Sequence, residues 1–542
     1  MSGIPSVPTP RNESVLSYEP GSAERQELKA TLKRMADERI EIPLVIGGQE
    51  VRTGDIAEST MPHAHGHVLA TWHRAGRAEI ERAIRSALEA GREWAEWPWE
   101  DRIAVFLKAA ELLSTSWRAR LNAATMLGQS KTAQQAEIDS ACELIDFLRF
   151  NAHFAARLYT EQPNSAPGIW NRMEYRPLEG FVYAITPFNF TAIAGNLPGA
   201  PALMGNVSVW KPSDKAIYSG YQIVKLLEAA GLPPGVVNFV PGHARSITEV
   251  VLSSPGLAGI HYTGSTEVFQ SIWKQVGERI SSYRGYPRLV GETGGKDFIL
   301  AHASADPEAV AVSIVRGGYE YQGQKCSAAS RVFIPASLWP EVRERTLEMI
   351  DDIRMGDPRD FRNFMGAVID RTAFDKITEY VEHAKTASSV EILAGGGWDD
   401  REGYFVEPTL VQVSDPSYRL MCEEVFGPVV AVHVYPDERW TQTLSIVDRS
   451  TPYALTGAVF ATDRRAIREA STTLRNAAGN FYINDKPTGA VVGQQPFGGS
   501  RASGTNDKAG SIFNLQRWVS PRTVKETFVP AKAFGYPFMA DS

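Results

Sequence analysis

The sequence predicts an α/β protein with more than one domain, and three observations support this prediction. The 542 residues exceed the roughly 250–300 at which a single hydrophobic core stops growing. The composition, 43% hydrophobic and 22% charged, is that of an ordinary globular chain. After Gly180, short apolar segments alternate with helical ones, which is typical of a parallel sheet covered by helices.

The part before Gly180 is expected to be mainly helical. Apolar residues at helical spacing predict helices over 23–38 and 78–97 and a helical segment over 101–160. Strands are then predicted at 181–185, 207–210, 236–240 and 258–262, with helices at 216–230 and 246–253. A second α/β series, with strands at 298–300 and 331–334 and helices at 306–321 and 338–353, continues to about 515. Residues 518–530 alternate like a strand and are expected to join another sheet or subunit.

Charge, cysteine content and hydropathy argue against several classes of protein. The net charge of −7 gives no electrostatic reason to expect nucleic acid or an anionic membrane as a partner. No apolar run approaches the roughly 20 residues that span a bilayer. Three cysteines cannot form a disulfide framework, so a reducing compartment is favoured. The first ten residues carry three prolines and no targeting pattern, which predicts an extended arm and a cytoplasmic location rather than the mitochondrial matrix.

Cys326 is the most informative single residue. It lies in the segment GQKCS (323–327), and Glu292 precedes it in the glycine-rich segment GETGGK (291–296). A thiol with a nearby base can act as a nucleophile, and burial can raise the pKa of a carboxylate toward that of a general base. Taken singly, Cys326 can also be an inert buried thiol, the interpretation given to Cys142 and Cys422, and Glu292 a surface residue beside a turn.

Other polar groups follow predicted strands, where ligands bind in parallel sheets. The amide of Asn189 can donate to a developing oxyanion, and the free amides of segment 262–266 can bind a pyrophosphate where a helix begins. Lys211 can reach a ribose hydroxyl. The simpler alternatives are an asparagine that stabilises a turn, a helix N-cap at Ser265 and a solvated lysine. The common GxGxxG dinucleotide fingerprint is absent.

The order and spacing of six motifs resemble the aldehyde dehydrogenase superfamily over about residues 40–535. The motifs are TPFNF (186–190), WKPSD (210–214), YTGST (262–266), GETGGK (291–296), GQKCS (323–327) and EEVFGP (423–428). Within the superfamily, the stretches 195–206, 480–507 and 521–527 resemble the pyrroline-5-carboxylate dehydrogenase group. The resemblance implies NAD as cofactor and glutamate γ-semialdehyde as substrate, oxidised to glutamate in the second step of proline catabolism.

The resemblance also implies a role for individual residues. Cys326 attacks the aldehyde carbon, Asn189 and the Cys326 backbone N–H stabilise the oxyanion, and Glu292 activates the water that releases the product. The implied cofactor contacts are Thr186, Lys211, Gly264, Ser265, Thr266, Glu424 and Phe426. The implied substrate contacts are Phe190 and Phe497 around the aliphatic chain, and Ser327, Gly489 and Ala490 at the carboxylate. No metal ligand is implied.

Several positions depart from the superfamily pattern. Ala490 stands where many members carry a serine, so one hydrogen bond to the substrate carboxylate is expected to be missing. Phe269 occupies a position that is often glycine and is expected to alter the packing of the cofactor helix, and Thr191 replaces a common proline. Asp214 replaces a glutamate that often selects NAD, which leaves the margin over NADP open.

The implied architecture has a Rossmann-type NAD-binding domain (40–164 and 184–291) and an α/β catalytic domain (292–515). A β-strand oligomerisation flap (165–183 and 516–535) and an N-terminal arm with a helix (1–39) complete it. The flap implies a homodimer or a dimer-based higher oligomer. A chain that holds one aldehyde dehydrogenase unit is compatible with association with a separate proline dehydrogenase.

Four alternative functions remain to be weighed. They are oxidation of another small carboxylate-bearing aldehyde, formation of an acyl-CoA, ester hydrolysis by the thiol, and a non-enzymatic scaffold. Glu292 disfavours the acyl-CoA product, because hydrolysis is the step that needs a base. The cofactor positions Lys211, Gly264 and Glu424 argue against a pure esterase, and the complete set of reactive groups argues against a scaffold.

Overall fold

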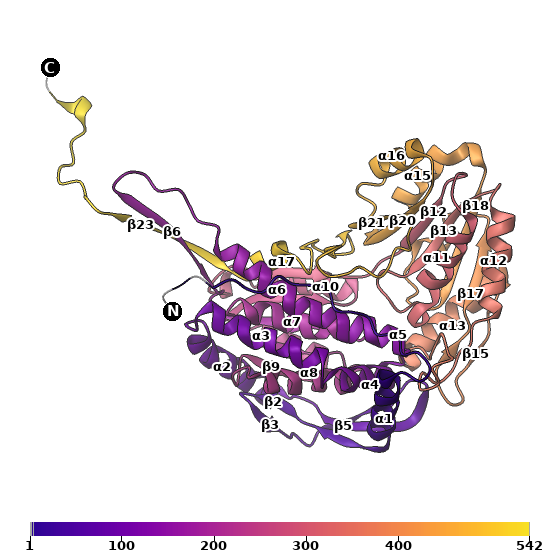
Figure 1. The fold of residues 1–542 in the computed structure, drawn as a ribbon, viewed down its shortest axis with the longest axis horizontal. Helices are drawn as coiled ribbons and strands as arrows, with labels where there is room; N and C mark the ends of the chain where they lie inside the picture. Colours follow the sequence, from indigo (N-terminus) through magenta and orange to yellow (C-terminus); the bar gives the residue numbers. More distant parts are fainter. Residues whose placement is uncertain (1–2, 4, 541–542) are drawn as a thin grey trace.

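Two seven-stranded sheets organise the part of the chain that the computed structural model describes, residue 3 and residues 5–540 (Figure 1). The first sheet has five parallel strands at one end and an antiparallel pair at the other. Its order is β11 (Arg288–Glu292), β10 (Leu257–Thr263), β7 (Phe181–Ile185), β8 (Ser208–Lys211), β9 (Val237–Phe239), β2 (Leu44–Ile46) and β3 (Gln49–Val51).

Helices are the main elements of the N-terminal half. Some of them, such as α2 and α7, pack on this sheet, whereas α1 and α3 pack mainly on other helices. An amphipathic sequence explains α2, in which Ile80, Ala83, Ile84 and Ala87 form the buried face, while α7 is apolar and buried nearly all round. The helices are α1 (Ala23–Asp37), α2 (Arg77–Trp94), α3 (Trp99–Ser114), α4 (Arg118–Gln129), α5 (Ala133–Ala136), α6 (Glu143–Tyr159), α7 (Thr191–Leu203), α8 (Ile217–Ala230), α9 (Ala244–Leu252), α10 (Thr266–Glu278) and the 3₁₀ turn η2 (Ile280–Ser282). A π-helical segment, η1 (Glu137–Cys142), precedes α6. A small sheet pairs β5 (Ala64–His73) with β1 (Ile40–Ile42) and β4 (Ile56–Met61).

The second sheet is buried on both faces. In β12 (Asp297–Ala301), Phe298 and Leu300 join one hydrophobic cluster while Ile299 and Ala301 join another, because alternate side chains of a strand face opposite sides. The strand order is β14 (Val390–Ala394), β17 (Thr409–Val413), β18 (Val429–Tyr435), β13 (Ala329–Pro335), β12, β20 (Thr456–Phe460) and β21 (Asn480–Ile483). Only β14 runs antiparallel to its neighbour.

Helices and short pairings complete this second half. The helices are α11 (Pro307–Tyr319), α12 (Trp339–Asp351), α13 (Arg371–Thr386), α14 (Arg419–Cys422), α15 (Trp440–Arg449), α16 (Arg464–Thr473) and α17 (Ile512–Gln516), with 3₁₀ turns η3 (Glu320–Gly323), η4 (Asp437–Arg439) and η5 (Pro537–Met539). The short strand pairs are β15 (Trp398–Asp399) with β16 (Phe405–Val406) and β19 (Tyr453–Ala454) with β22 (Ser500–Arg501).

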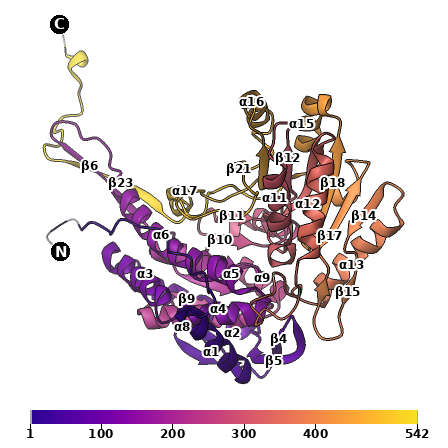
Figure 2. The ribbon, with the colours of Figure 1, turned by 45° about the vertical axis from the view of Figure 1, so that its right-hand side comes forward.

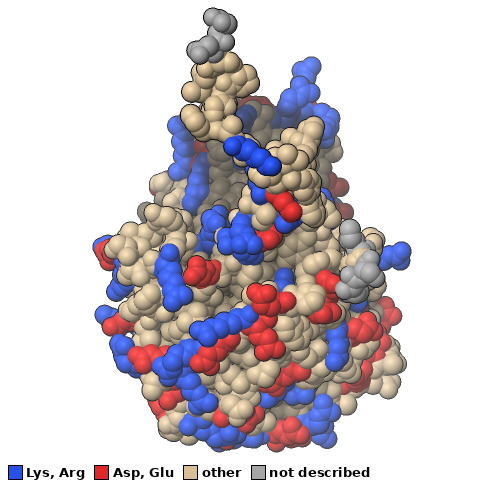
Figure 3. Space-filling view, turned by 90° about the vertical axis from the view of Figure 1, so that its left-hand side faces the viewer, with Lys and Arg blue, Asp and Glu red and all other residues tan. Residues whose placement is uncertain are grey.

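A two-stranded ribbon projects from the body of the molecule, as both views show (Figure 1, Figure 2). It pairs β6 (Ile169–Arg176) with β23 (Ser520–Thr527) in antiparallel register, from Ser520 opposite Arg176 to Thr527 opposite Ile169. Residues 528–540 continue beyond the ribbon as an exposed segment. On the face seen in Figure 3, this projecting end is largely uncharged, whereas positive and negative side chains are interspersed below it. Its exposed apolar residues are Phe528, Val529, Phe534, Tyr536, Phe538 and Met539.

The predicted α/β fold is confirmed, and the differences lie in its details. Strand β7 matches the predicted strand 181–185 and begins before residue 184, where the NAD-binding domain was expected to resume. The predicted helical segment 101–160 is divided among four α-helices and η1, since the chain turns near residues 115–117 and 130–132. The tail predicted to join another sheet or subunit pairs with β6 of the same chain.

Candidate active site

The turn that precedes Cys326 has an unusual backbone. Tyr321, Gln322 and Gly323 have φ values of 51°, 55° and 65° in succession, although only glycine adopts such angles without steric cost. Side-chain hydrogen bonds hold the strained part, because the amide of Gln322 donates to the carbonyl oxygens of Ser130 (3.1 Å) and Ala367 (2.7 Å). The turn is therefore fixed by contacts to both halves of the molecule.

Asn189 reaches this turn from the first sheet. It follows β7, is 4% exposed, and donates from Nδ2 to the carbonyl oxygen of Gln324 at 3.0 Å. A side-chain amide carries two donor hydrogens, so one remains for another acceptor. The structure thus brings Asn189 beside the turn that carries Cys326, as the oxyanion prediction requires.

The electrostatic surroundings of Cys326 favour the neutral thiol. Burial raises its pKa above the ordinary range, and the negative charges of Asp297, Glu424 and Glu292 raise it further. The surroundings therefore do not activate the thiol by lowering its pKa. The adjacent Lys325 does not point its charge at the thiol, so Cys326 needs a base in order to react.

Glu292 ends strand β11, and its surroundings favour the protonated form more than those of an ordinary glutamate do. Its Oε2 accepts a hydrogen bond from the backbone N–H of Gly499 at 2.9 Å. Burial raises its pKa well above the usual range and Asp507 raises it further, while the Gly499 bond and Lys508 act in the opposite direction. A carboxyl group with a raised pKa can take up a proton and return it within the working pH range.

An inner cavity of about 60 Å³ gathers the predicted substrate residues beside Cys326. Its lining includes Phe190, Cys326, Ser327, Gly489, Ala490 and Phe497. Aromatic rings therefore meet polar groups in one enclosed space, which suits a small ligand with an apolar chain and a charged end. Asp139, Glu143 and Lys325 also line this cavity and were not selected from the sequence.

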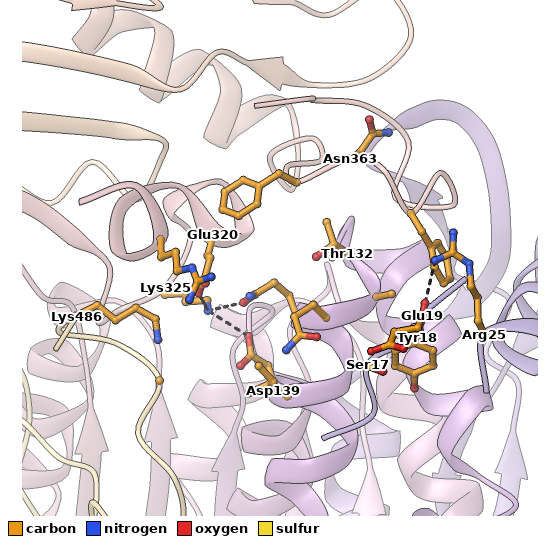
Figure 4. A pocket seen from close by; sticks show the side chains of 18 of the residues that line it. Ser17, Tyr18, Glu19, Arg25, Thr132, Asp139, Glu320, Lys325, Asn363 and Lys486 are labelled. Atoms are coloured by element: carbon orange, nitrogen blue, oxygen red, sulfur yellow. Dashed lines mark hydrogen bonds and ion pairs between the residues drawn. The ribbon is translucent and has the colours of Figure 1, made fainter. Parts of the chain in front are cut away.

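A larger outer cavity of about 580 Å³ adjoins the inner one (Figure 4). The two share Ile138, Asp139, Lys325 and Gly489 as lining residues. Lys325 Nζ donates to Gln135 Oε1 and lies 3.7 Å from Asp139 Oδ2 and 3.4 Å from Glu320 Oε2. Lys325 thus forms part of the partition between the cavities, and its neighbouring carboxylates raise its pKa despite burial.

The predicted cofactor residues gather at the ends of β7, β8 and β10. Thr186 Oγ1 accepts a hydrogen bond from Trp210 Nε1 at 2.9 Å, and Lys211 forms an ion pair with Asp214 at 2.9 Å. Ser265 is the N-cap residue of α10, but its side chain makes no capping bond. The start of α10 therefore offers unused donors to an anion.

Glu424 and Phe426 approach this region from the second half of the molecule. Glu424 Oε1 accepts from the Gly295 backbone N–H at 2.9 Å, and a Cβ atom at Gly294 would lie 2.7 Å from Glu424 Oε2. Burial raises the pKa of Glu424. Phe426 adopts φ 61°, and its ring contacts Phe188 edge to face at 5.9 Å between centroids.

Comparison with known proteins decides the family. A sequence model of the aldehyde dehydrogenase family matches residues 51–524. The chain belongs to the aldehyde dehydrogenase family. This confirms the superfamily resemblance of the six motifs and the fold that it implied.

Similar proteins come from distant organisms. The chain is 52% identical over 539 residues to "Delta-1-pyrroline-5-carboxylate dehydrogenase, mitochondrial" of Dictyostelium discoideum, covering 99% of this chain and 96% of the relative. A crystal structure of the Mycobacterium tuberculosis Delta-pyrroline-5-carboxylate dehydrogenase bound with NAD matches with a TM-score of 0.97 at 53% identity, over the full length of both chains. Proline utilization A of Bdellovibrio bacteriovorus matches with a TM-score of 0.91 at 29% identity, over 98% of this chain and 55% of that chain.

Two departures of this aldehyde dehydrogenase from the family pattern, Phe269 and Thr191, have structural explanations. Phe269 stacks on Tyr262 at 5.2 Å, and a Cβ atom at Gly291 would lie 2.2 Å from the Phe269 ring. The bulky residue on α10 is thus accommodated by a glycine on β11. Thr191, at the start of α7, forms hydrogen bonds with Thr125 (2.8 Å) and Gln129 (3.2 Å), which a proline could not make.

Two further features of this aldehyde dehydrogenase were not predicted from the sequence. A groove of about 720 Å³ runs between α9 and α10, with Val268 and Ile272 among its lining residues. Thr488 lies in the inner cavity, and its hydroxyl is 2.8 Å from that of Ser327. The sequence alone does not point to Thr488, because its contact with Ser327 joins residues that are far apart in the chain. Among the described residues, every helix is too short or too polar to span a bilayer.

Proposed function

We propose that this chain oxidises glutamate γ-semialdehyde, the open form of 1-pyrroline-5-carboxylate, to glutamate, with NAD as hydride acceptor. The observation that carries the proposal is the inner cavity, whose lining brings Cys326 together with two aromatic rings and with polar groups. Phe190 and Phe497 suit the methylene chain, while Ser327 and the Gly489 backbone suit the carboxylate. The names of the similar proteins support this substrate.

The residues around Cys326 divide the chemistry into two stages. The thiol of Cys326 gives its proton to the Glu292 carboxylate, which passes it on to solvent, and attacks the aldehyde carbon, while the second amide hydrogen of Asn189 and the Cys326 backbone N–H stabilise the oxyanion. When bound beside this site, NAD would supply the acceptor for the hydride of this carbon. Glu292 then removes a proton from water, and the water cleaves the thioester to give glutamate and the free thiol.

The residues of the cofactor region fit a dinucleotide. Gly294 leaves room beside Glu424 that a Cβ atom would fill, and the uncapped start of α10 presents free N–H groups to a pyrophosphate. Lys211 and Glu424 are proposed to hold the two riboses. The phosphates are proposed to lie beside Gly264, Ser265 and Thr266. The nicotinamide is proposed to lie between Thr186 and Phe426, and the adenine is proposed to bind in the α9–α10 groove.

The decisive experiment is NADH formation from pyrroline-5-carboxylate by the Cys326→Ala variant. Loss of aldehyde-dependent NADH formation is expected, because this side chain is the proposed nucleophile. Cys422→Ala serves as a matched control that is expected to keep activity, since Cys422 lies outside the inner cavity. Normal turnover by Cys326→Ala would contradict the proposal.

Two further measurements separate the alternatives. Comparing kcat/KM for glutamate semialdehyde and succinate semialdehyde tests substrate preference, with a higher value expected for glutamate semialdehyde. Calorimetry tests NAD binding, and its absence would favour the thiol esterase alternative. We also propose that the protein forms a homodimer through the β6–β23 ribbon, that it can associate with a separate proline dehydrogenase, and that it is located in the cytoplasm. Because several relatives are named as mitochondrial, cell fractionation is the test of location.

A further inference from the structure

The carboxylate end of the inner cavity has an alanine where many family members carry a serine. Ala490 lines the cavity and has no donor on its side chain. A carboxylate that leaves water for a partly apolar cavity needs hydrogen-bond donors in compensation. Among the residues that line the inner cavity, the side-chain hydroxyl groups belong to Ser327 and Thr488.

Ser327 and Thr488 form a buried hydroxyl pair. Their oxygen atoms are 2.8 Å apart, and the residues are 4% and 3% exposed. Each hydroxyl brings one hydrogen, and the bond between them uses one of the two. Within the described residues, neither hydroxyl makes another hydrogen bond to protein, so one hydrogen stays available in the cavity.

The backbone around Thr488 holds this pair in place. Lys486 Nζ donates to the Thr488 carbonyl oxygen at 3.2 Å, and Lys486 projects into the outer cavity from the same loop (Figure 4). Gly489 follows with φ 93°, which permits the sharp turn after Thr488. Threonine is also stiff about χ1, so its hydroxyl is well positioned as a partner for the more mobile serine.

We infer that Thr488 is a specificity-determining residue, which positions the Ser327 hydroxyl to donate to a substrate carboxylate and replaces the donor missing at Ala490. Thr488 donates to Ser327 Oγ, and the Ser327 hydrogen then points to the ligand. In such a chain the first bond polarises the second and strengthens it. The inference rests on the proposed function, because it assigns the inner cavity to an aldehyde that bears a carboxylate.

The test measures kcat/KM for two aldehydes, glutamate semialdehyde and the uncharged butanal, in five variants. Thr488→Val keeps the shape of the side chain but removes the hydroxyl. It is expected to lower the ratio of the two kcat/KM values about tenfold, the equivalent of one hydrogen bond of about 1.4 kcal/mol. The loss should appear mainly as a higher KM for the semialdehyde, since the carboxylate is remote from the reacting carbon.

Four companion variants make the result specific. Thr488→Ser restores the hydroxyl and should restore most of the ratio. Ser327→Ala should lower the ratio, and the double variant Ser327→Ala/Thr488→Val should lower it no further, because Thr488 acts through Ser327. Thr346→Val removes a buried hydroxyl in α12, where Thr346 donates to the Val342 carbonyl oxygen, and is the control for threonine-to-valine exchange.

The contrary results are equally distinct. An unchanged ratio in Thr488→Val, equal losses for both aldehydes, or losses that multiply in the double variant would overturn the inference. These outcomes leave the proposed function standing as long as the wild-type protein oxidises the semialdehyde and Cys326→Ala does not. If the wild-type protein does not oxidise it, the proposed function itself fails.

Discussion

At the scale of single residues, Glu292 offers a test of both stages of the proposed reaction. Glu292→Gln keeps the size of the side chain but cannot take a proton from the thiol or from water. The variant is expected to form NADH slowly even in its first turnover and to turn over about 10²- to 10⁴-fold more slowly than the wild type at steady state, because general-base catalysis contributes that much. Stopped-flow absorbance at the start of the reaction, followed by steady-state rates, checks this.

The pKa of Glu292 also predicts a pH dependence. A base must be deprotonated to act, and burial raises the pKa of this carboxyl, so the wild-type rate should climb with pH above the usual range of a glutamate. The steady-state rate of Glu292→Gln should not show this rise with pH. If the rate of Glu292→Gln rises with pH as the wild-type rate does, the titrating group is not Glu292.

Lys296 allows a prediction for stability. Its Nζ is buried, and no acceptor among the described residues bonds to it; burial and Arg331 lower its pKa to about 7, against the opposing effects of Glu424, Asp297 and Cys422. Between pH 7 and its ordinary value of 10.5, the unfolded chain therefore binds more protons, so the free energy of unfolding should rise with pH.

Lys296→Met removes this titration and keeps the aliphatic length. Relative to wild type, the variant should gain most stability below pH 7, where the buried ammonium is charged, and lose that advantage as pH rises. The difference in the free energy of unfolding between Lys296→Met and the wild type is expected to change by up to about 1.4 kcal/mol per pH unit. Urea unfolding at pH 6.5 and pH 9 measures it, and a difference that is independent of pH would contradict the assignment.

The chemistry of individual residues in the sequence predicted only part of the candidate site. Cys326 and Glu292 could be proposed as site residues because glycine-rich segments surround reactive groups, and the structure places the third candidate, Asn189, beside the turn that carries Cys326. Thr488 was not identifiable, since its partner Ser327 is 161 positions away and nothing local marks an ordinary threonine. The raised pKa of Cys326 was equally hidden, because it arises from carboxylates that only folding brings close.

At the scale of elements, the turn of η3 stores strain that a pair of substitutions can expose. Gln322→Ala and Gln322→Gly both remove the two amide hydrogen bonds, but alanine keeps a Cβ atom at φ 55°. Glycine accepts this angle freely, so Gln322→Gly should be the more stable variant by about 1 kcal/mol. Equal unfolding free energies in urea would mean that the turn relaxes when its side chain is lost.

Elements with a strong local pattern were predicted closely, and the others were not. Strand β7 coincides with the predicted range because five apolar residues are bounded by Gly180 and by the Thr186-Pro187 turn. The strands between residues 40 and 73 escaped prediction, since they are short or partly exposed and gain their order from pairing. The π-helical segment η1 also has no local signature and depends on buried contacts such as those of Glu137 with Arg118 and Tyr18.

At the scale of the whole molecule, the β6–β23 ribbon predicts self-association. Trp170 lies on β6 and is 51% exposed, which is unusual for so large an apolar side chain. Trp170→Glu is expected to weaken the proposed homodimer and lower the mass seen in sedimentation velocity. Trp398→Glu alters another exposed tryptophan, on β15, and should leave the mass unchanged. A wild-type protein that sediments as a monomer would exclude the dimer.

The same ribbon has a consequence for biosynthesis. Arg176 and Ser520, which face each other across it, are separated by 344 positions. At about 5–20 residues per second, a ribosome needs roughly 20–70 s to make the second strand after the first. During that interval β6 is a free edge with an exposed tryptophan, open to pairing with a neighbouring nascent chain. The ribbon is therefore the place where crowded translation would first produce aggregates of this protein.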